Sequence, residues 1–427
     1  MTAKLKTHTL GCKVNQYETQ FLREGLLSIG YQDAGENEPA DLCVVNTCTV
    51  TNEGDSKSRQ IIRRMHRKNP DARIVVMGCY ATRAPEEVGS LPGVAEVVTN
   101  KRELPDVLGR FGVVDIPNGI SGLSNRHRAY VKVQDGCLLR CSYCIIPAVR
   151  PEMYSRPMDE VVDEVKRLVD RGYREVVLTG IHLGHYGVDF NRGKSKPDWV
   201  RLSRLVQALC DIPGDFRVRM SSIEATEVTA ELIQAMADWP QKVCGHLHVC
   251  LQSGSDAVLR RMRRRWSVQH IIDRCELIKQ TLDRPALTTD LIVGFPGETD
   301  QEFADSLDTC RKIGFSKIHM FPFSARRGTP AAEMDQQISK AVKSARGREV
   351  AEVERSNRNK YANEVIGAEV RMLVEQKTDD GTISGTTCRY LPASLKVSPE
   401  RAISLDGELV SFTVESTDGE QITGSVI

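Results

Sequence analysis

The sequence predicts an α/β protein built in three parts. Strand-like and helix-like segments alternate over roughly the first hundred residues, which predicts a small parallel αβα sheet. A longer alternation from 128 to 323 predicts a partial (β/α)6 barrel, with fewer units than the usual closed barrel. Short strands with Gly and Asp-Gly turns then predict a small antiparallel β-barrel. The 427 residues suffice for about three domains, which we place at 3–113, 123–353 and 356–427.

The N-terminal part contains three apolar stretches and two amphipathic ones. "LKTHTLGC", "DLCVVN" and "ARIVVMGC" predict strands that end near residues 12, 46 and 79. Between them, "QYETQFLREGLLSIG" and "GDSKSRQIIRRMHRKNP" predict helices that stop at Gly30 and before Pro70. This order of strands and helices indicates a parallel sheet with helices on its faces.

A segment rich in Gly, Pro, Asn and Ser, residues 111–127, has the composition of a linker to the second part. The strands predicted beyond it are 128–134, 174–180, 216–222, 246–251, 287–294 and 317–323. The helices predicted there are 157–171, 200–210, 227–238, 255–264, 268–281 and 299–313. A long polar helix, 336–363, leads to the short strands of the C-terminal part.

Composition bounds the class of protein. Hydrophobic residues make up 40% and charged residues 27% of the chain, which is ordinary for a globular protein. No run of about 18 apolar residues occurs, and the start has no pattern of a secretion signal. We therefore expect a cytoplasmic protein with no membrane contact. Thirteen cysteines are many for that reducing compartment, so metal binding or catalysis is the better explanation for some of them.

Positive charge is concentrated locally, although the net charge is only +1. The stretches "KSRQIIRRMHRK" and "RRMRRR" are strongly basic, and clustered Lys and Arg bind phosphate backbones. The same stretches can equally be solvated helix faces, and charge alone leaves both interpretations open. The candidate phosphate contacts are Arg63, Arg64, Arg261, Arg263 and Arg264.

Three cysteines follow the first strand of the predicted barrel with the spacing Cys-x3-Cys-x2-Cys. We call Cys137, Cys141 and Cys144 the loop triad. Three thiolates on one short loop can hold three irons of a four-iron cluster and leave the fourth without a protein ligand. An open position is typical of a catalytic metal rather than a structural one. The alternatives are a three-cysteine zinc site and a chance cluster.

A second set of cysteines is far apart in sequence. Cys12, Cys48 and Cys79, which we call the sheet-edge triad, each follow a predicted strand of the N-terminal sheet. Because parallel strands end at one edge of a sheet, these thiols should converge there. The pattern indicates a second three-cysteine site. Free cysteines are also common as small core residues, and the residues alone do not decide between the two.

The loop triad, in its place after the first strand of a six-unit barrel, resembles the radical S-adenosylmethionine enzymes. The segments "GCKVNQYET", "VVNTCTVTNEGDSKSRQ", "VVMGCYATR", "CSYCIIPAVR", "LTGIHLGHYG", "LIVGFPGET" and "MFPFSARRGTP" extend this resemblance over nearly the whole chain. Together they are similar to the radical methylthiotransferases, and the C-terminal part resembles their RNA-binding TRAM domain. Pro151, Ala225 and Cys250 depart from the family pattern. The first two leave the local geometry of their loops open, and we expect Cys250 to be a small packed residue and not a ligand.

The resemblance implies two [4Fe-4S] clusters held by the two triads, and S-adenosylmethionine used twice. One molecule donates the methyl group of a methylthio unit, and a second yields a radical that abstracts hydrogen from C2 of an adenine. Flavodoxin or ferredoxin is implied as electron donor. The expected cofactor contacts are Tyr143, Thr179, Gly180, Ser222, Glu224, Gln252 and Gly294. Several of these are equally explained by turn formation. We expect only one of His246 and His248 to face this site.

Three branches of the family differ in substrate. "GCKVNQYE" and "TGIHLGHYG" look most like the branch that modifies N6-threonylcarbamoyladenosine, next to the anticodon of ANN-decoding tRNAs. The other branches act on isopentenyladenosine in tRNA or on an aspartate of a ribosomal protein. A non-enzymatic iron–sulfur protein that binds RNA is the alternative from another class.

Overall fold

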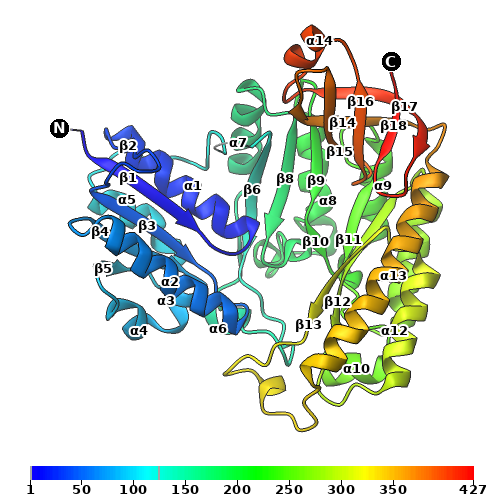
Figure 1. Ribbon diagram of the computed structural model, residues 1–427, viewed down its shortest axis with the longest axis horizontal. Coiled ribbons are helices and arrows are strands. Elements are labelled where there is room, and N and C mark those ends of the chain that lie inside the picture. Colours follow the sequence, from blue (N-terminus) through cyan, green and yellow to red (C-terminus); the bar gives the residue numbers. More distant parts are fainter. Residues whose placement is uncertain (1, 124–125) are drawn as a thin grey trace.

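The computed structural model describes residues 2–123 and 126–427. Figure 1 shows the N-terminal sheet to one side of a central, strongly curved set of strands, with a small barrel over one end of that set. Ser124 and Asn125, within the linker expected at 111–127, lie outside the described residues. Among the described helices, none is both long and apolar enough to cross a membrane.

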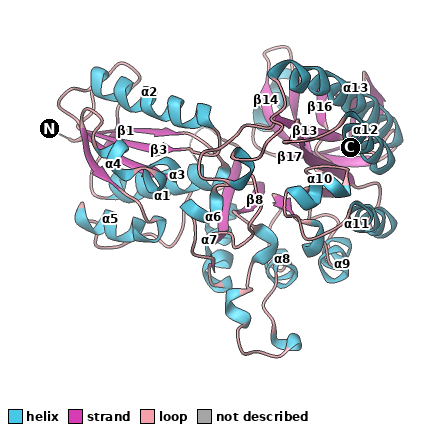
Figure 2. Cartoon of the chain, turned by 90° about the horizontal axis from the view of Figure 1, so that it is seen from below, coloured by secondary structure: helices cyan, strands magenta, loops and turns pink. Residues whose placement is uncertain are grey.

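The N-terminal part is a five-stranded parallel sheet in the order β2-β1-β3-β4-β5. Its strands are β1 (Lys4–Thr9), β2 (Gln32–Asp33), β3 (Leu42–Thr47), β4 (Arg73–Gly78) and β5 (Val94–Val97). The helices are α1 (Lys13–Ser28), α2 (Asn52–Lys68), α3 (Cys79–Arg83), α4 (Pro85–Gly89) and α5 (Leu104–Arg110). Every residue of the central strand β3 is buried, because helices cover both faces of the sheet. Figure 2 shows α2 and α5 on opposite faces, so the predicted αβα layering is confirmed.

The central part contains the six parallel strands that the sequence predicts. They form two four-stranded sheets, β7-β6-β8-β9 and β10-β11-β12-β13. A parallel bridge between Val218 and Val243 connects these sheets into one curved wall. The six strands are β6 (Arg128–Asp135), β8 (Glu175–Gly180), β9 (Arg217–Met220), β11 (His246–Val249), β12 (Ala286–Val293) and β13 (Lys317–Pro322). Two short strands complete the sheets, β7 (Tyr154–Ser155) beside β6 and β10 (Ser222–Ile223) beside β11. The expected partial barrel is confirmed.

Helices cover the outside of this wall. They are α7 (Met158–Asp170), α8 (Leu202–Cys210), α9 (Ala230–Asp238), α10 (Asp256–Arg261), α11 (Val268–Thr281) and α12 (Asp300–Ile313). The short α6 (Ile146–Val149) follows the loop triad and packs against α3 of the N-terminal part. Helix α12 shows how local sequence sets these boundaries. Thr299 and Glu302 form a capping box at its start, and Gly314 ends it in the left-handed conformation. The long helix α13 (Lys340–Glu364) packs along α12 and β13 before the chain enters the third part.

The C-terminal part is a closed five-stranded barrel in the order β14-β15-β16-β18-β17. Its strands are β14 (Glu369–Lys377), β15 (Thr382–Thr387), β16 (Pro392–Lys396), β17 (Leu409–Thr417) and β18 (Ile422–Val426). A helix, α14 (Pro399–Ser404), connects β16 to β17. Four strand pairings are antiparallel, as predicted, but the contact between β16 and β18 that closes the ring is parallel.

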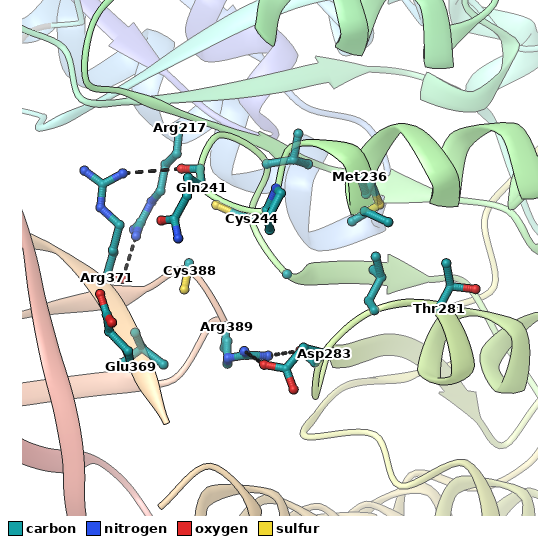
Figure 3. A pocket seen from close by; sticks show the side chains of 16 residues that line it. Arg217, Met236, Gln241, Cys244, Thr281, Asp283, Glu369, Arg371, Cys388 and Arg389 are labelled. Carbon is teal, nitrogen blue, oxygen red and sulfur yellow. Dashed lines mark hydrogen bonds and ion pairs between the residues drawn. The ribbon is translucent and has the colours of Figure 1, made fainter. Parts of the chain in front are cut away.

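Buried ion pairs attach this barrel to the amino ends of the central strands. Glu175 is fully buried and accepts hydrogen bonds from Arg217 Nε at 2.6 Å and from Arg219 Nε at 2.8 Å. The same two guanidinium groups donate to the carbonyl oxygens of Arg371 and Thr387 in the C-terminal part. A cavity of about 400 Å³ lies beside this attachment. Figure 3 shows that side chains of both parts line it.

Candidate functional site

The loop triad lies between β6 and α6, at the carboxyl end of the first strand of the central part. Its loop is fixed by backbone hydrogen bonds to two distant segments. The Ser142 N–H donates to the carbonyl of Met262 at 3.0 Å, and the Ser142 carbonyl accepts from the Ala331 N–H at 2.8 Å. These bonds fix the part of the loop that lies between Cys141 and Cys144.

Two cationic side chains lie against the thiols of the loop triad. Arg264 Nη1 donates towards the Sγ of Cys141 at 3.3 Å, and its other nitrogen pairs with Glu224. His182 Nδ1 lies 3.7 Å from the Sγ of Cys137, and its Nε2 is 3.3 Å from a carboxylate oxygen of Glu227. Each cation is therefore held between a cysteine and a carboxylate from the segment after β10.

The surroundings control the protonation of these groups. Burial raises the pKa of Cys144 to about 12 and also raises the pKa of Cys141, which Arg264 partly offsets. Burial alone would lower the pKa of His182, but its hydrogen bond with Cys137 and its ion pair with Glu227 raise that pKa to about 9. A metal that binds here must displace the protons that these raised pKa values keep on Cys141 and Cys144, as in other thiolate sites. Three soft sulfur donors with positive neighbours fit an iron–sulfur cluster better than a hard cation.

The structure brings the sheet-edge triad together as the strand pattern predicts. Cys12 follows β1, Cys48 follows β3, and Cys79 begins α3 directly after β4. Burial raises the pKa of Cys48, and the neighbouring Cys79 and Cys12 thiols raise it further. Gly11 has a φ of +104°, and a Cβ at that position would lie 3.3 Å from the Sγ of Cys48. The turn therefore needs glycine where the first and second cysteines approach each other.

Several of the expected cofactor contacts lie near the loop triad. Tyr143 is within the loop, and its hydroxyl lies 3.5 Å from Arg264 Nη1. Glu224 is the carboxylate that pairs with Arg264. Ser222 is exposed on β10, whereas Thr179 is buried on β8.

The other expected contacts have local explanations. The N–H of Gly294 donates to Glu298 at 2.6 Å, and Lys343 packs where a Cβ at Gly294 would stand. Gly180 packs against the side chain of Gln134. Gln252 has a φ of +65° and joins β12 through its backbone. The amide of Gly294 is occupied, so turn formation explains that glycine without a ligand.

The candidate phosphate contacts fall into two groups. Arg63 and Arg64 are exposed on α2, and Arg263 is exposed after α10. Arg261 already makes a bidentate pair with Glu302, at 2.9 and 2.7 Å. The prediction for Arg264 is wrong, because its side chain is 2% exposed and lies between Cys141 and Glu224. A backbone phosphate cannot reach it there.

A polar group on β11 and β12 was not predicted. His246 Nε2 and His248 Nδ1 both lie about 3 Å from the hydroxyl of Thr288, at 2.9 and 3.0 Å. His248 also lies 3.3 Å from Asp290, and Cys250 lies beside this pair. The expectation that only one of the two histidines faces inward is wrong, because residues two apart on a strand point to the same face. That two-residue period was the signal in the sequence.

Comparison with known proteins agrees with this arrangement. Residues 131–310 match the model of the Radical SAM superfamily, and residues 4–100 match the uncharacterized protein family UPF0004. A threonylcarbamoyladenosine tRNA methylthiotransferase, MtaB, of Bacillus subtilis is 38% identical over 416 residues, covering 92% of this chain and 90% of the relative. The MtaB protein of Chlamydia pneumoniae is also 38% identical, covering 98% of this chain and 97% of its own. This chain belongs to the radical S-adenosylmethionine methylthiotransferase family. Membership implies [4Fe-4S] clusters and S-adenosylmethionine as cofactors.

Other relatives have a different substrate in their names. The tRNA-2-methylthio-N(6)-dimethylallyladenosine synthase of Aquifex aeolicus is 33% identical, covering 100% of this chain and 99% of its own. Among solved structures, the radical S-adenosylmethionine methyltransferase TsrM of Kitasatospora setae superposes with a TM-score of 0.55 at 13% identity, covering 75% of this chain and 73% of TsrM. The cobalamin-dependent enzyme OxsB superposes with a TM-score of 0.53 at 12% identity, covering 83% of this chain and 61% of OxsB. At such low identity these structures support the fold alone.

Proposed function

We propose that this methylthiotransferase adds a methylthio group to C2 of N6-threonylcarbamoyladenosine, the nucleoside next to the anticodon in ANN-decoding tRNAs. The observation that supports this proposal is the presence of two three-cysteine sites at strand ends of neighbouring domains. The two MtaB relatives at 38% identity favour threonylcarbamoyladenosine over dimethylallyladenosine, since the dimethylallyladenosine synthases of Aquifex aeolicus and Mycolicibacterium paratuberculosis are 33% and 35% identical. We propose cytoplasmic tRNA as substrate and flavodoxin or ferredoxin as electron donor.

We propose that each triad ligates one [4Fe-4S] cluster, with domain boundaries at 3–113, 123–353 and 356–427. When bound, these groups and S-adenosylmethionine supply the radical and the methylthio unit. The chain contributes the geometry. Arg264 and Glu224 fix the side of the loop triad at Cys141, and His182 with Glu227 fixes the side at Cys137. Tyr143, Thr179, Ser222 and Gln252 stay candidate contacts for S-adenosylmethionine.

The substrate base must leave its stack to enter such a site, and a base in a loop does so at low cost. Exposed arginines are suited to bind the phosphates beside that base. We propose Arg63, Arg64 and Arg263 for this role. Arg261 can join them only by giving up part of its pair with Glu302.

Nucleoside analysis tests the proposed substrate. Digested tRNA from a strain without this gene should contain threonylcarbamoyladenosine and lack its methylthio derivative, and the gene should restore that derivative. Loss of methylthio-isopentenyladenosine, or of a ribosomal methylthio-aspartate with tRNA unchanged, would assign the enzyme to another branch. Reduced protein that forms no 5′-deoxyadenosine from S-adenosylmethionine would favour the non-enzymatic RNA-binding protein.

A further inference from the structure

One buried arginine connects the two triads. Arg150 follows α6, and only 4% of its surface is exposed. Its backbone carbonyl accepts a hydrogen bond at 3.3 Å from the N–H of Cys137, a member of the loop triad. Its guanidinium group points the other way, into the N-terminal domain, where Nη2 donates to the side-chain oxygen of Asn15 at 3.1 Å. Arg150 therefore bonds to both domains at the level of their cysteines.

Asn15 continues the connection to the sheet-edge triad. Its side-chain oxygen lies 3.8 Å from the Sγ of Cys12. Its side-chain nitrogen donates to the carbonyls of Leu10 at 2.8 Å and Thr47 at 3.1 Å, which precede Cys12 and Cys48 by two residues and one residue. Asn15 is 1% exposed and holds the ends of β1 and β3 together. A displacement of Asn15 would move two of the three cysteines.

Two carboxylates fix the guanidinium group between these partners. Arg150 Nη1 lies 2.8 Å from Glu18 on α1 and 2.8 Å from both oxygens of Asp135 at the end of β6. Lys132 pairs with the same two acids, so two positive and two negative side chains balance in a buried set. Asp135 also accepts from the N–H of Gly136, the residue before Cys137. Such a network is rigid because moving one member leaves another charge unpaired.

We propose that Arg150 is a positioning residue that fixes the distance between the two triads. This inference rests on the proposed function, in which both triads act on one adenine. A radical reaction is sensitive to such a distance, since a shift of about 1 Å in a reacting group can lower a rate up to roughly 100-fold. Loss of the Arg150 side-chain contacts should therefore uncouple the two reactions. S-adenosylmethionine is then cleaved without transfer of the methylthio group.

The test uses Arg150→Lys, which keeps the charge and loses the two-sided hydrogen bonding. Asn15→Ala removes the acceptor of the Arg150 hydrogen bond without removing a charge. If Arg150→Lys fails to fold, Asn15→Ala still tests the positioning role. The matched control is Arg156→Lys. Arg156 is also buried at the domain boundary, but its side chain bonds to Tyr17, Glu164 and the backbone carbonyl of Lys132, and not to Asn15, Glu18 or Asp135.

The first measurement is the amount of 5′-deoxyadenosine formed per methylthio nucleoside, with unmodified tRNA as substrate. We expect this ratio to rise roughly tenfold in Arg150→Lys and in Asn15→Ala. Iron content and melting temperature of Arg150→Lys should match those of Arg156→Lys, whose ratio should equal that of the wild type. Equal ratios in the Arg150 and Arg156 variants would show that Arg150 only holds the domains together and would overturn the proposal.

The second measurement does not depend on turnover. Electron paramagnetic resonance of the reduced protein reports the magnetic interaction between two clusters, which changes with their separation. We expect this interaction to change in Arg150→Lys and to stay as in the wild type in Arg156→Lys. An unchanged interaction in Arg150→Lys and Asn15→Ala contradicts the positioning role. A wild-type protein that makes no methylthio nucleoside refutes the proposed function instead, and the spectra still decide the role of Arg150.

Discussion

Replacing Glu175 with glutamine should loosen the C-terminal barrel from the rest of the protein. Glu175 is fully buried and neutralises Arg217 and Arg219, which are 1% and 3% exposed, while Arg128 lies 3.5 Å away. Burial alone would raise the pKa of Glu175, but these guanidinium groups hold that pKa well below its usual range. The variant keeps the shape of the side chain and removes the negative charge that lies between Arg217 and Arg219.

The expected loss of stability depends on Arg217 and Arg219, which stay buried without their carboxylate partner. Removing one partner of a buried ion pair costs about 3–5 kcal/mol, because the remaining charge is left uncompensated. Glutamine still accepts hydrogen bonds, so we expect about 3 kcal/mol. The loss should be localised, because Arg217 and Arg219 also donate to the carbonyls of Arg371 and Thr387. Those bonds depend on the orientation that Glu175 gives to the two arginines.

Thermal unfolding measures the loss of stability of the whole protein. Hydrogen exchange measures how firmly the C-terminal barrel is attached to the central part. Peptides that contain Thr386 and Thr387 should exchange faster in Glu175→Gln than in the wild type. The control is Glu408→Gln, which removes a partly exposed pair with Arg174 between the same two parts and should cost less than about 1 kcal/mol. An equal loss of unfolding free energy in the two variants would refute the reasoning. It would show that burial does not determine how much an ion pair contributes to stability.

Three further predictions concern the site. Cys12→Ala should lower the iron content from about eight to about four per chain while 5′-deoxyadenosine still forms, and an unchanged iron content would remove Cys12 from the ligand set. Arg63→Ala should reduce the slope of log affinity for tRNA against log salt by about 0.7–0.9, measured by fluorescence anisotropy, and an unchanged slope would return Arg63 to a solvated helix face. Burial and the neighbouring His182 lower the pKa of His185 to about 4, below the unfolded value of 6.5, so its protonation favours unfolding. The stability that neutral His185 provides is present above pH 6.5 and is lost as the pH falls towards 4, by about 1 kcal/mol between pH 7 and pH 5 once solvent screening of the partly exposed ring is included. His185→Asn should flatten this part of the melting curve against pH, and equal acid sensitivity would contradict the shift.

The strand and helix order was predictable because it depends on local pattern. The apolar stretch that became β3 and the capping residues of α12 act over a few positions. The parallel contact between β16 and β18 was not predictable in this way. It depends on how the end of the chain returns across the barrel, and a single registered pair, Ala393 with Ile422, makes it.

The candidate site also contains some residues that the sequence predicts and others that only tertiary packing places. The spacing of Cys137, Cys141 and Cys144 is local, and the strand ends that bring Cys12, Cys48 and Cys79 together follow from parallel pairing, so the sequence by itself determined both triads. The basic stretch that contains Arg264 could not show which of its arginines points inward. Its burial against Cys141, 123 residues earlier, depends on the packing of α10 over the loop.

Only the tertiary structure decided how the triads are joined. Arg150 lies 132 residues from Glu18 and 135 from Asn15, and no local pattern relates such distant positions. The preference of a buried guanidinium group for carboxylate partners is general, but the domain packing chooses which carboxylates are within reach. The sequence therefore determined the two sets of thiols, and the packing of the first domain on the second determined the contacts that hold them at a fixed separation.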